Sequence, residues 1–290
     1  MANETTSSTI SELYTEIVQE ALFVASEQSI MRNLVRNYTI VGGGKSVEVP
    51  IYATVSASAV NEATDLSNTA VNPSSVTITA SEVGIMTTLT DLARNSAPRN
   101  VAGDIGRLFG EAIARKVDAD LSALFTGFST EKAGGAGQEL TVQDLFEASA
   151  ELRTNNAPAP YYGVFHPKQI FNVKKSLTNT FAGLNTELSN EAMRSGFVGQ
   201  IAGIEIFESS NISVDGSDDS IGGVFSQDAL ALAMMQDLKI ESQRDASLRA
   251  DEIVATAVYG VGEIHDTYGV KLTADSVAVS YTHLTLPTKA

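Results

Sequence analysis

The sequence predicts an α+β fold, in which helices and strands occupy different segments of one chain. A long apolar pattern over residues 100–128 repeats at spacings of three and four, which is typical of a helix. Two short runs, residues 46–52 and 75–80, alternate between apolar and other side chains, which predicts strands. Helical and strand patterns are mixed after residue 140. With 290 residues, 43% of them hydrophobic, the chain is long enough to bury a core.

The first helix is expected from residue 9 to about residue 37. Thr9 and Glu12 match a capping box at its start. Apolar side chains then recur on one helical face and again further along: Ile10, Leu13, Tyr14, Ile17, Val18, Ala21, Leu22, Ile30, Met31, Leu34 and Val35.

Residues 46–80 are predicted to form an extended arm. Some twenty small and polar residues separate the two predicted strands, and a hairpin alone in water is marginal at best. A connection of this length inside a compact domain is uncommon unless it is functional or disordered. Two interpretations stay open: the arm is disordered, or it gains its order by lying on another subunit. The strand patterns at both ends favour the second.

The helix over residues 100–128 is the clearest element. Asn100 suits the N-cap position, and two oppositely charged pairs lie four residues apart, Glu111 with Arg115 and Lys116 with Asp120. At 1.5 Å per residue such a helix spans roughly 40 Å. Three glycines near its start cost helix stability and therefore indicate close packing there: Gly103, Gly106 and Gly110. A glycine-rich loop at residues 132–137 then ends the first half.

The second half is predicted to contain alternating short elements. Helices are expected at residues 141–154, from Pro167 onward and at residues 188–195, with Pro167 at a suitable first position. Strands are expected at residues 161–165, within residues 196–212, and as two or three strands within residues 238–274. The apolar runs at residues 224–226 and 230–234 fit either a strand or the edge of a helix.

The stretch Val41-Gly-Gly-Gly-Lys45-Ser46 looks like a phosphate-binding loop but fails on spacing and context. The first glycine of that motif would fall at Thr39. A strand pattern with Pro50 follows where the motif requires a helix. The glycines therefore predict a flexible turn into a strand.

The chain is strongly acidic, with 19 basic and 35 acidic residues and a net charge of −16. Proteins that grip nucleic acid neutralise phosphates with Lys and Arg, so we expect repulsion from DNA and from anionic membranes. The chain has no cysteine, which excludes disulfides and thiolate catalysis. We find neither a long apolar run nor a signal peptide at the start. These features favour a cytoplasmic setting.

Catalytic patterns are scarce, and we expect no catalytic, cofactor-binding or metal site. His166 precedes Pro167 at a helix start, which favours a structural cap over catalysis. His265 is interpreted as an exposed strand histidine rather than a weak metal ligand. Residues 215–219, Asp-Gly-Ser-Asp-Asp, lack the EF-hand pattern, so a solvated turn is favoured over a calcium site.

Residues 280–290 differ from everything before them. They resemble a translated sequencing adapter and are set aside as a non-native tail, the alternative being a genuine C-terminal strand.

Several stretches in order resemble the major capsid protein of tailed bacteriophages, which has the Hong Kong 97 shell fold. The stretches similar to its extended loop are VEVPIY at residues 47–52, NEATD at 61–65 and VTITA at 76–80. Residues 100–128 are similar to its spine helix. The stretches similar to its axial and peripheral domains are YGVFHPKQ at residues 162–169, GQIAGIEIFES at 199–209, residues 239–248 and YGVG at 259–262. The resemblance covers roughly residues 5–279.

The resemblance implies an N-terminal arm and helix at residues 1–45, an extended hairpin loop at 46–90 and a spine helix at 91–135. It implies an axial domain at residues 136–235 and closing strands of the peripheral domain at 236–279, followed by the tail at 280–290. It also implies hexamers and pentamers of the chain in an icosahedral shell, the virion capsid, that encloses double-stranded DNA without binding it specifically. Glu62, Asp65 and Asn68 near the arm tip are expected to contact a neighbour.

Residues 53–74 contain no Lys, so we expect no covalent cross-link of the kind known in part of this family. Because the chain starts directly in its first helix, we expect any scaffolding protein to be separate, alongside a portal. Two alternatives remain. An encapsulin-type nanocompartment shares the fold but encloses enzymes, and a metal-dependent hydrolase would need converging carboxylates.

Overall fold

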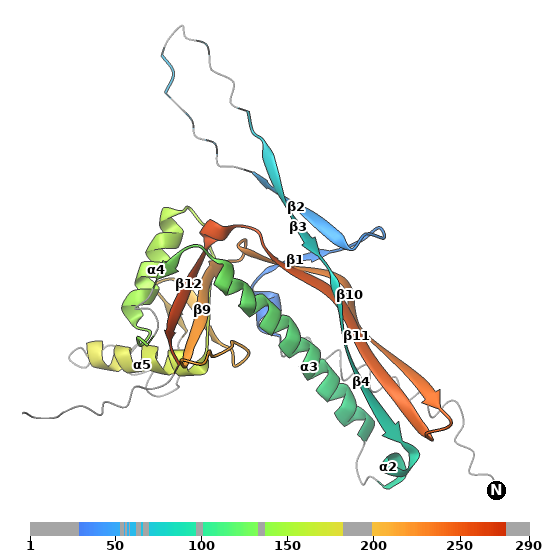
Figure 1. The fold of residues 1–290 in the computed structure, drawn as a ribbon. Helices are drawn as coiled ribbons and strands as arrows, with labels where there is room; N and C mark the ends of the chain where they lie inside the picture. The colour runs from blue at the N-terminus through green and yellow to red at the C-terminus, as the bar shows by residue number, and fades with distance from the viewer. Residues whose placement is uncertain are drawn as a thin grey trace, which may run out of the picture. The chain divides into compact units, whose positions relative to one another are not determined.

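The computed structural model describes residues 29–52, 55, 57, 59–61, 65, 70–96, 101–132, 137–181 and 199–276 (Figure 1). The first predicted helix up to residue 28, the short helix predicted at residues 188–195 and the tail at 280–290 lie outside these ranges. The chain divides into two compact units. Unit 1 comprises residues 1–121 and 230–264, and unit 2 comprises residues 122–229 and 265–290.

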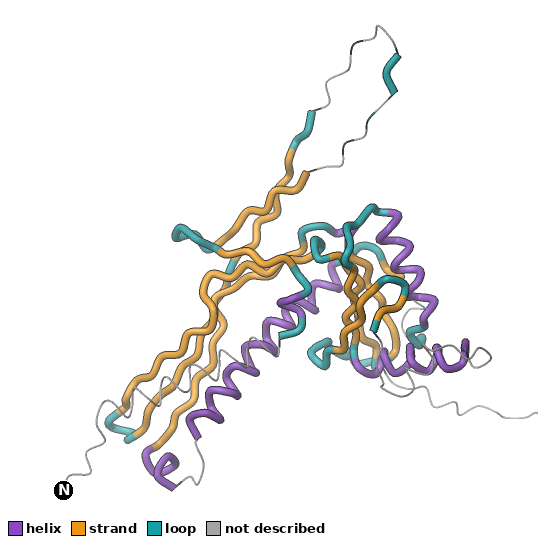
Figure 2. The backbone as a smooth tube through the Cα atoms, turned by 180° about the vertical axis from the view of Figure 1, so that it is seen from behind, coloured by secondary structure: helices purple, strands orange, loops and turns teal. Residues whose placement is uncertain are grey.

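Unit 1 contains a four-stranded sheet in the order β1-β10-β11-β4. Its strands are β1 (Arg36–Thr39), β10 (Leu230–Asp245), β11 (Ala250–Glu263) and β4 (Ser81–Thr90). β10 and β11 are a long antiparallel pair, β4 pairs antiparallel with β11, and β1 pairs parallel with β10. The helix α3 (Val101–Ala123), most of which belongs to this unit, runs beside the sheet in both views (Figures 1 and 2). The short helix α2 (Asp91–Ser96) follows β4 directly.

The predicted long helix is confirmed by α3 and the 3-10 helix η2 (Leu124–Gly127) that continues it. Arg115 Nη2 lies 3.6 Å from Glu111 Oε2 and Lys116 Nζ lies 2.6 Å from Asp120 Oδ1, which are the two pairs expected from the spacing. Gly106 and Gly110 are buried. The start of the helix is therefore packed closely, as its glycines predicted.

The prediction of a helix through residues 30–37 is wrong. The chain forms the 3-10 helix η1 (Met31–Asn33) and then the strand β1. Arg36 to Thr39 pair with Ala231 to Met234 of β10. The burial of Met31, Leu34 and Val35 comes from this packing and not from a helical face. A sheet partner two hundred residues away has overridden the local pattern.

A buried carboxylate holds the start of the described chain on α3. Asp118 is 1% exposed. It accepts hydrogen bonds from Ser29 Oγ at 2.7 Å, from the backbone N of Ile30 at 3.1 Å and from the backbone N of Met31 at 3.2 Å. These bonds satisfy backbone donors at the start of η1, which have no acceptor within that helix. Residues 29–31 are thereby fixed to the C-terminal half of α3.

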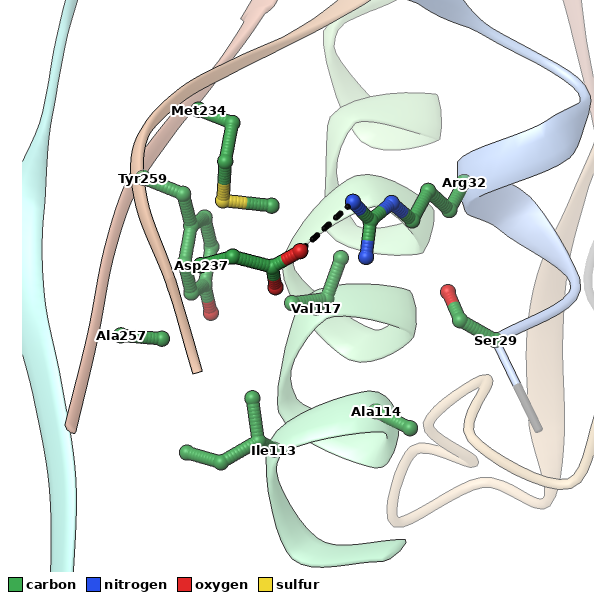
Figure 3. A pocket seen from close by; sticks show the side chains of 9 residues that line it. All are labelled: Ser29, Arg32, Ile113, Ala114, Val117, Met234, Asp237, Ala257 and Tyr259. Carbon is green, nitrogen blue, oxygen red and sulfur yellow. Dashed lines mark hydrogen bonds and ion pairs between the residues drawn. The ribbon is translucent and has the colours of Figure 1, made fainter. Parts of the chain in front are cut away.

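A small pocket lies beside this contact (Figure 3). Arg32 Nη2 and Asp237 Oδ2 form an ion pair at 3.2 Å across it. The space open to the centre of a water molecule is about 20 Å³, which is room for one or two waters. Its lining residues are Ser29, Arg32, Ile113, Ala114, Val117, Met234, Asp237, Ala257 and Tyr259. The pocket is too small for an organic ligand.

One tyrosine joins the sheet to α3. Tyr259 of β11 is 2% exposed, and its hydroxyl donates a hydrogen bond to Asp120 Oδ2 at 2.8 Å. Burial first, and the Asp120 carboxylate second, raise the pKa of Tyr259 well above its ordinary value. The phenol therefore keeps its proton in the folded protein at pH values where an exposed tyrosine ionises.

Unit 2 contains a six-stranded sheet in the order β5-β12-β9-β6-β8-β7. Its strands are β5 (Glu131–Lys132), β12 (Gly269–Asp275), β9 (Asp219–Ser226), β6 (Tyr161–Phe165), β8 (Ile204–Glu208) and β7 (Gln200–Ile201). The helices α4 (Val142–Thr154) and α5 (Pro167–Phe181) bury their apolar sides in a core with this sheet, around Leu145, Leu152, Ile170, Val173 and Leu272. The 3-10 helix η3 (Asp266–Tyr268) precedes β12.

The local predictions for unit 2 are confirmed within the described ranges. α4 starts after Thr141, whose backbone N and hydroxyl both donate to Asp144 Oδ2, at 2.7 and 2.8 Å. β6 has the predicted bounds and α5 begins at Pro167. β7 and β8 form the expected turn and strand within residues 196–212, and β10 to β12 are the three strands expected near the end.

Replacing Asp118 should destabilise unit 1. Asp118→Ala leaves three donors, two of them buried, without their acceptor, so we expect the free energy of unfolding to fall by about 2–4 kcal/mol in urea titrations. Asp104→Ala, an exposed acid on the same helix, should change it by less than about 1 kcal/mol. Equal losses in the two variants would contradict the role given to Asp118.

The Tyr259 phenol should make the free energy of unfolding decrease at alkaline pH. In the unfolded chain the phenol ionises near pH 10, whereas the folded pKa is higher, so its contribution is complete below that pH and falls as pH rises. Tyr259→Phe should cost about 1 kcal/mol at pH 7. The gap to the wild type should then close by up to about 1.4 kcal/mol per pH unit above pH 10. Parallel urea titrations at pH 7 and 11 test this.

Candidate functional site

The arm predicted at residues 46–80 is a two-stranded hairpin with a buried base. β2 (Ser46–Tyr52) pairs antiparallel with β3 (Pro73–Thr79), from Ser46 opposite Thr79 to Tyr52 opposite Pro73. Both predicted strands are confirmed. Within the described part of the chain β2 pairs with β3 alone, and Pro50 lies in the middle of it.

The base of the hairpin is held by its own chain. Val49 is 5% exposed and Ile78 is 2% exposed. They share a buried cluster with residues of β10 and of the segments flanking the strands: Ile40, Ala80, Ala231, Ala233 and Ile264. The expectation that the arm needs another subunit for its order therefore does not hold for the base, because Val49 and Ile78 are covered by unit 1.

Two glycines of β11 allow the hairpin to approach the sheet. A Cβ on Gly260 would overlap the backbone carbonyl of Thr79, and one on Gly262 would lie 2.8 Å from Ile78 Cγ1. Backbone cannot move aside as a flexible side chain can. β3 therefore crosses β11 at a distance that only glycine permits.

Beyond this base the hairpin carries exposed apolar side chains. Tyr52 is 65% exposed, Val55 52%, Val60 48% and Val71 50%. Large apolar side chains gathered on one projecting element are typical of a surface that meets another molecule. Figures 1 and 2 show this element extending away from the sheet of unit 1.

The three predicted contact residues are only partly described. Asp65 is exposed, whereas Glu62 and Asn68 lie outside the described residues. Their role in contacts with a neighbour stays a prediction.

The glycine-rich loop before β2 is a turn and not a phosphate cradle. Gly42 and Gly43 have φ values of +91° and +83°, which favour glycine. A strand follows Lys45, where a phosphate-binding loop requires a helix. The exclusion of that motif is confirmed.

The two described histidines have different outcomes. The cap role of His166 is confirmed, because the backbone N of Lys168 donates to His166 Nδ1 at 3.4 Å at the start of α5. The placement of His265 is wrong: it follows β11, is half-buried and lies against the Tyr268 ring, with centroids 4.6 Å apart. Burial lowers the pKa of both imidazoles, and Asp228 partly opposes this at His265.

The acidic stretch at residues 215–219 is a turn, as predicted. Asp215 Oδ1 accepts hydrogen bonds from the backbone N of Ser217 at 2.8 Å and of Asp219 at 2.9 Å. Asp219 Oδ1 accepts from the backbone N of Gly137 at 2.8 Å. Across the described ranges, no three His, Asp or Glu side chains converge as a metal site, and no helix is long and apolar enough to cross a membrane.

Comparison with solved structures defines the class of the fold as that of phage capsid shells. The capsid of cyanophage P-SCSP1u aligns with a TM-score of 0.69 at 20% identity, over 85% of this chain and 88% of that one. A protein of Microbacterium phage Oxtober96 gives 0.67 at 14% identity, over 85% and 91%. One of Mycobacterium phage Che8 gives 0.64 at 23% identity, over 79% and 84%.

The family follows from the sequence itself. The model of the phage capsid protein family matches residues 72–272, and the chain belongs to that family. No curated protein sequence matches it. The resemblance to a capsid protein and the predicted α+β shell fold are thus confirmed, and the encapsulin-type alternative is not favoured.

Sequence patterns alone missed the glycine contact and the Asp118 anchor. Gly260-Val-Gly262 inside a strand pattern is a signal of close backbone approach, although it does not reveal which segment approaches. Nothing local marks Asp118, since its partners lie nearly ninety residues away.

A side chain at Gly260 should displace the hairpin. Gly260→Val forces β3 away from β11 and should cost about 1–3 kcal/mol of unfolding free energy, with increased hydrogen exchange at β2 and β3. Gly44→Ala is the matched control, because a Cβ there meets nothing closer than 3.8 Å. A Gly260→Val variant with wild-type exchange in the hairpin would contradict the close crossing.

Proposed function

We propose that this chain is the major capsid protein of a tailed bacteriophage. Copies would assemble as hexamers and pentamers into an icosahedral shell around double-stranded DNA. The observation that carries the proposal is the hairpin, whose base is fixed in its own unit while Tyr52, Val55, Val60 and Val71 stay exposed beyond it. A projecting apolar element on a rigid base is suited to lie on a neighbouring copy.

The charge of the chain suits a container. A net charge of −16 gives little attraction to DNA phosphates, so the enclosed genome is not held by adhesion to the shell. In the described ranges His166 caps a helix and the acids of residues 215–219 close a turn, so these groups have structural roles. We infer a structural rather than an enzymatic role.

Further partners follow from the proposed role. Assembly would take place in the cytoplasm of the host bacterium, with a separate scaffolding protein and a portal. The polar side chains of Glu62, Asp65 and Asn68 would contact the neighbouring subunit near the arm tip. Residues 53–74 contain no Lys, so the contacts are non-covalent.

Shell formation is tested directly. The purified chain, alone and with its candidate scaffolding protein, should form closed particles in negative-stain micrographs. Dynamic light scattering should show a matching decrease in the diffusion coefficient. A chain that stays monomeric at every concentration tested, with and without the scaffolding protein, would contradict the proposal.

The arm should be required for assembly but not for folding. Replacing residues 53–72 by Asn-Gly joins Tyr52 to Pro73, which are already opposite each other, through a two-residue turn. We expect a thermal midpoint within a few degrees of the wild type and loss of particles. A shortened chain that still closes into shells would contradict the role of the arm.

The side chains of Glu62, Asp65 and Asn68 should affect assembly but not folding stability. The triple variant E62A/D65A/N68A should lower particle yield with an unchanged thermal midpoint. The triple variant T54A/S56A/S58A, which removes three other polar side chains from residues 53–72, serves as control. Equal yields from the two variants would remove these three residues from the interface.

A further inference from the structure

Two buried polar atoms of unit 2 have no hydrogen-bond partner among the described residues. They are Oδ1 of Asn172 in α5 and Oγ of Ser220 in β9. Asn172 is 2% exposed and Ser220 is 1% exposed. Leaving a buried polar group unpaired is costly, and in folded proteins nearly all such groups are paired with protein or with ordered water. Each of these two atoms therefore calls for a partner.

The orientation of the Asn172 amide is fixed by the end of β12. Its Nδ2 donates a hydrogen bond to the backbone carbonyl of Asp275 at 3.4 Å. Only the NH₂ group of an amide can face a carbonyl oxygen, because the amide oxygen has no hydrogen to donate. Asn172 Oδ1 therefore points away from that carbonyl and needs a donor of its own.

Gln169, which lies one turn earlier on α5, has partners for both ends of its amide. Its Nε2 donates to the backbone carbonyls of Ser220 at 2.8 Å and Ala274 at 3.1 Å. Its Oε1 accepts a hydrogen bond from the backbone N of His166 at 3.3 Å. Residues three apart on a helix lie on the same face. Asn172 therefore faces the same ends of β9 and β12 as Gln169 does.

The hydroxyl of Ser220 lies on the side of the sheet that α5 covers. Ser220 is directly opposite Ala274 in the pairing of β9 with β12, and directly opposite side chains share one face of a sheet. Ala274 belongs to the apolar core together with Ile170 and Val173 of α5. The Ser220 hydroxyl and the Asn172 amide are thus in the same layer. They are not hydrogen-bonded to each other, so a further group is needed between them.

The chemistry of the two atoms fits a water molecule. An amide oxygen accepts hydrogen bonds, and a hydroxyl can donate or accept, so one water can bond to both. Two neutral oxygens are too few for Ca²⁺ or Mg²⁺, which take about six or more oxygen ligands. In the described ranges no three His, Asp or Glu side chains converge to supply the remainder.

We propose that Asn172 Oδ1 and Ser220 Oγ hold one ordered water molecule between α5 and the ends of β9 and β12. The water donates to the amide oxygen and accepts from the serine hydroxyl. Buried waters of this kind are an integral part of a protein's structure. This one completes the polar attachment of α5 to the sheet, to which Gln169 already contributes two bonds. The site is internal to unit 2 and is independent of the proposed shell function.

The sign of a stability change tests the water site. With the water in place, Ser220→Ala removes a hydrogen-bond partner and should raise the unfolding equilibrium constant of the full chain in urea titrations by about fivefold. Without it, Ser220→Ala removes an unpaired buried hydroxyl, and the unfolding equilibrium constant should stay the same or fall. The second result would overturn the proposal.

Ser226→Ala is the matched control. Ser226 lies on the same strand, is 1% exposed as well, and donates from its Oγ directly to the carbonyl of Pro158 at 2.5 Å. Losing this direct hydrogen bond should raise the unfolding equilibrium constant. The water site predicts a change of similar size and the same sign in Ser220→Ala.

A high-resolution density map of the full chain locates the water directly. One peak should lie about 2.6–3.2 Å from both Asn172 Oδ1 and Ser220 Oγ. The peak should weaken in Ser220→Ala, which leaves the water one partner fewer. A map in which the two side chains bond directly to each other, or in which no peak lies between them, would contradict the site.

Discussion

The packing of the hairpin base against unit 1 is the constraint on which the arm depends. A two-stranded hairpin is marginal in water, and this one is stabilised because Val49 and Ile78 are buried with Ala231 and Ala233. The small side chains of β10 and the glycines of β11 leave room for that contact. One end of the hairpin is therefore packed against the sheet, while the other end presents apolar side chains to solvent. The same pair of strands thus has a packed base and an exposed apolar end.

The same unit uses buried polar contacts to position its helix. Asp118 fixes residues 29–31, and Tyr259 joins β11 to Asp120 two residues further along α3. Both contacts involve neighbouring residues of α3, Asp118 and Asp120. Residues 29–31 and the sheet are therefore attached to the same turn of the helix. Unit 2 has an apolar core of its own under α4 and α5. Each unit thus has its own source of stability.

The sequence predicted those elements that depend on residues close together in the chain. The proline that opens α5 and the alternation in β2 and β3 both act within a few residues, and both predictions were confirmed. The strand β1 was mistaken for helix because its partner in β10 is remote. β4 was not anticipated as a strand, although Val83, Ile85 and Leu89 alternate, because Gly84 and the following threonines weaken the pattern. The Gly260 crossing depends on which strands become neighbours, which periodicity cannot reveal.

Pro50 has a consequence for the protein before it assembles. A proline has no N–H to donate, so the outward edge of β2 offers an incomplete ladder to any approaching strand. Newly made subunits with exposed, partly apolar hairpins could otherwise zip together edge to edge into fibres. The interruption keeps such stacking short. The chain can therefore reach a higher concentration before identical hairpins pair into amyloid-like aggregates.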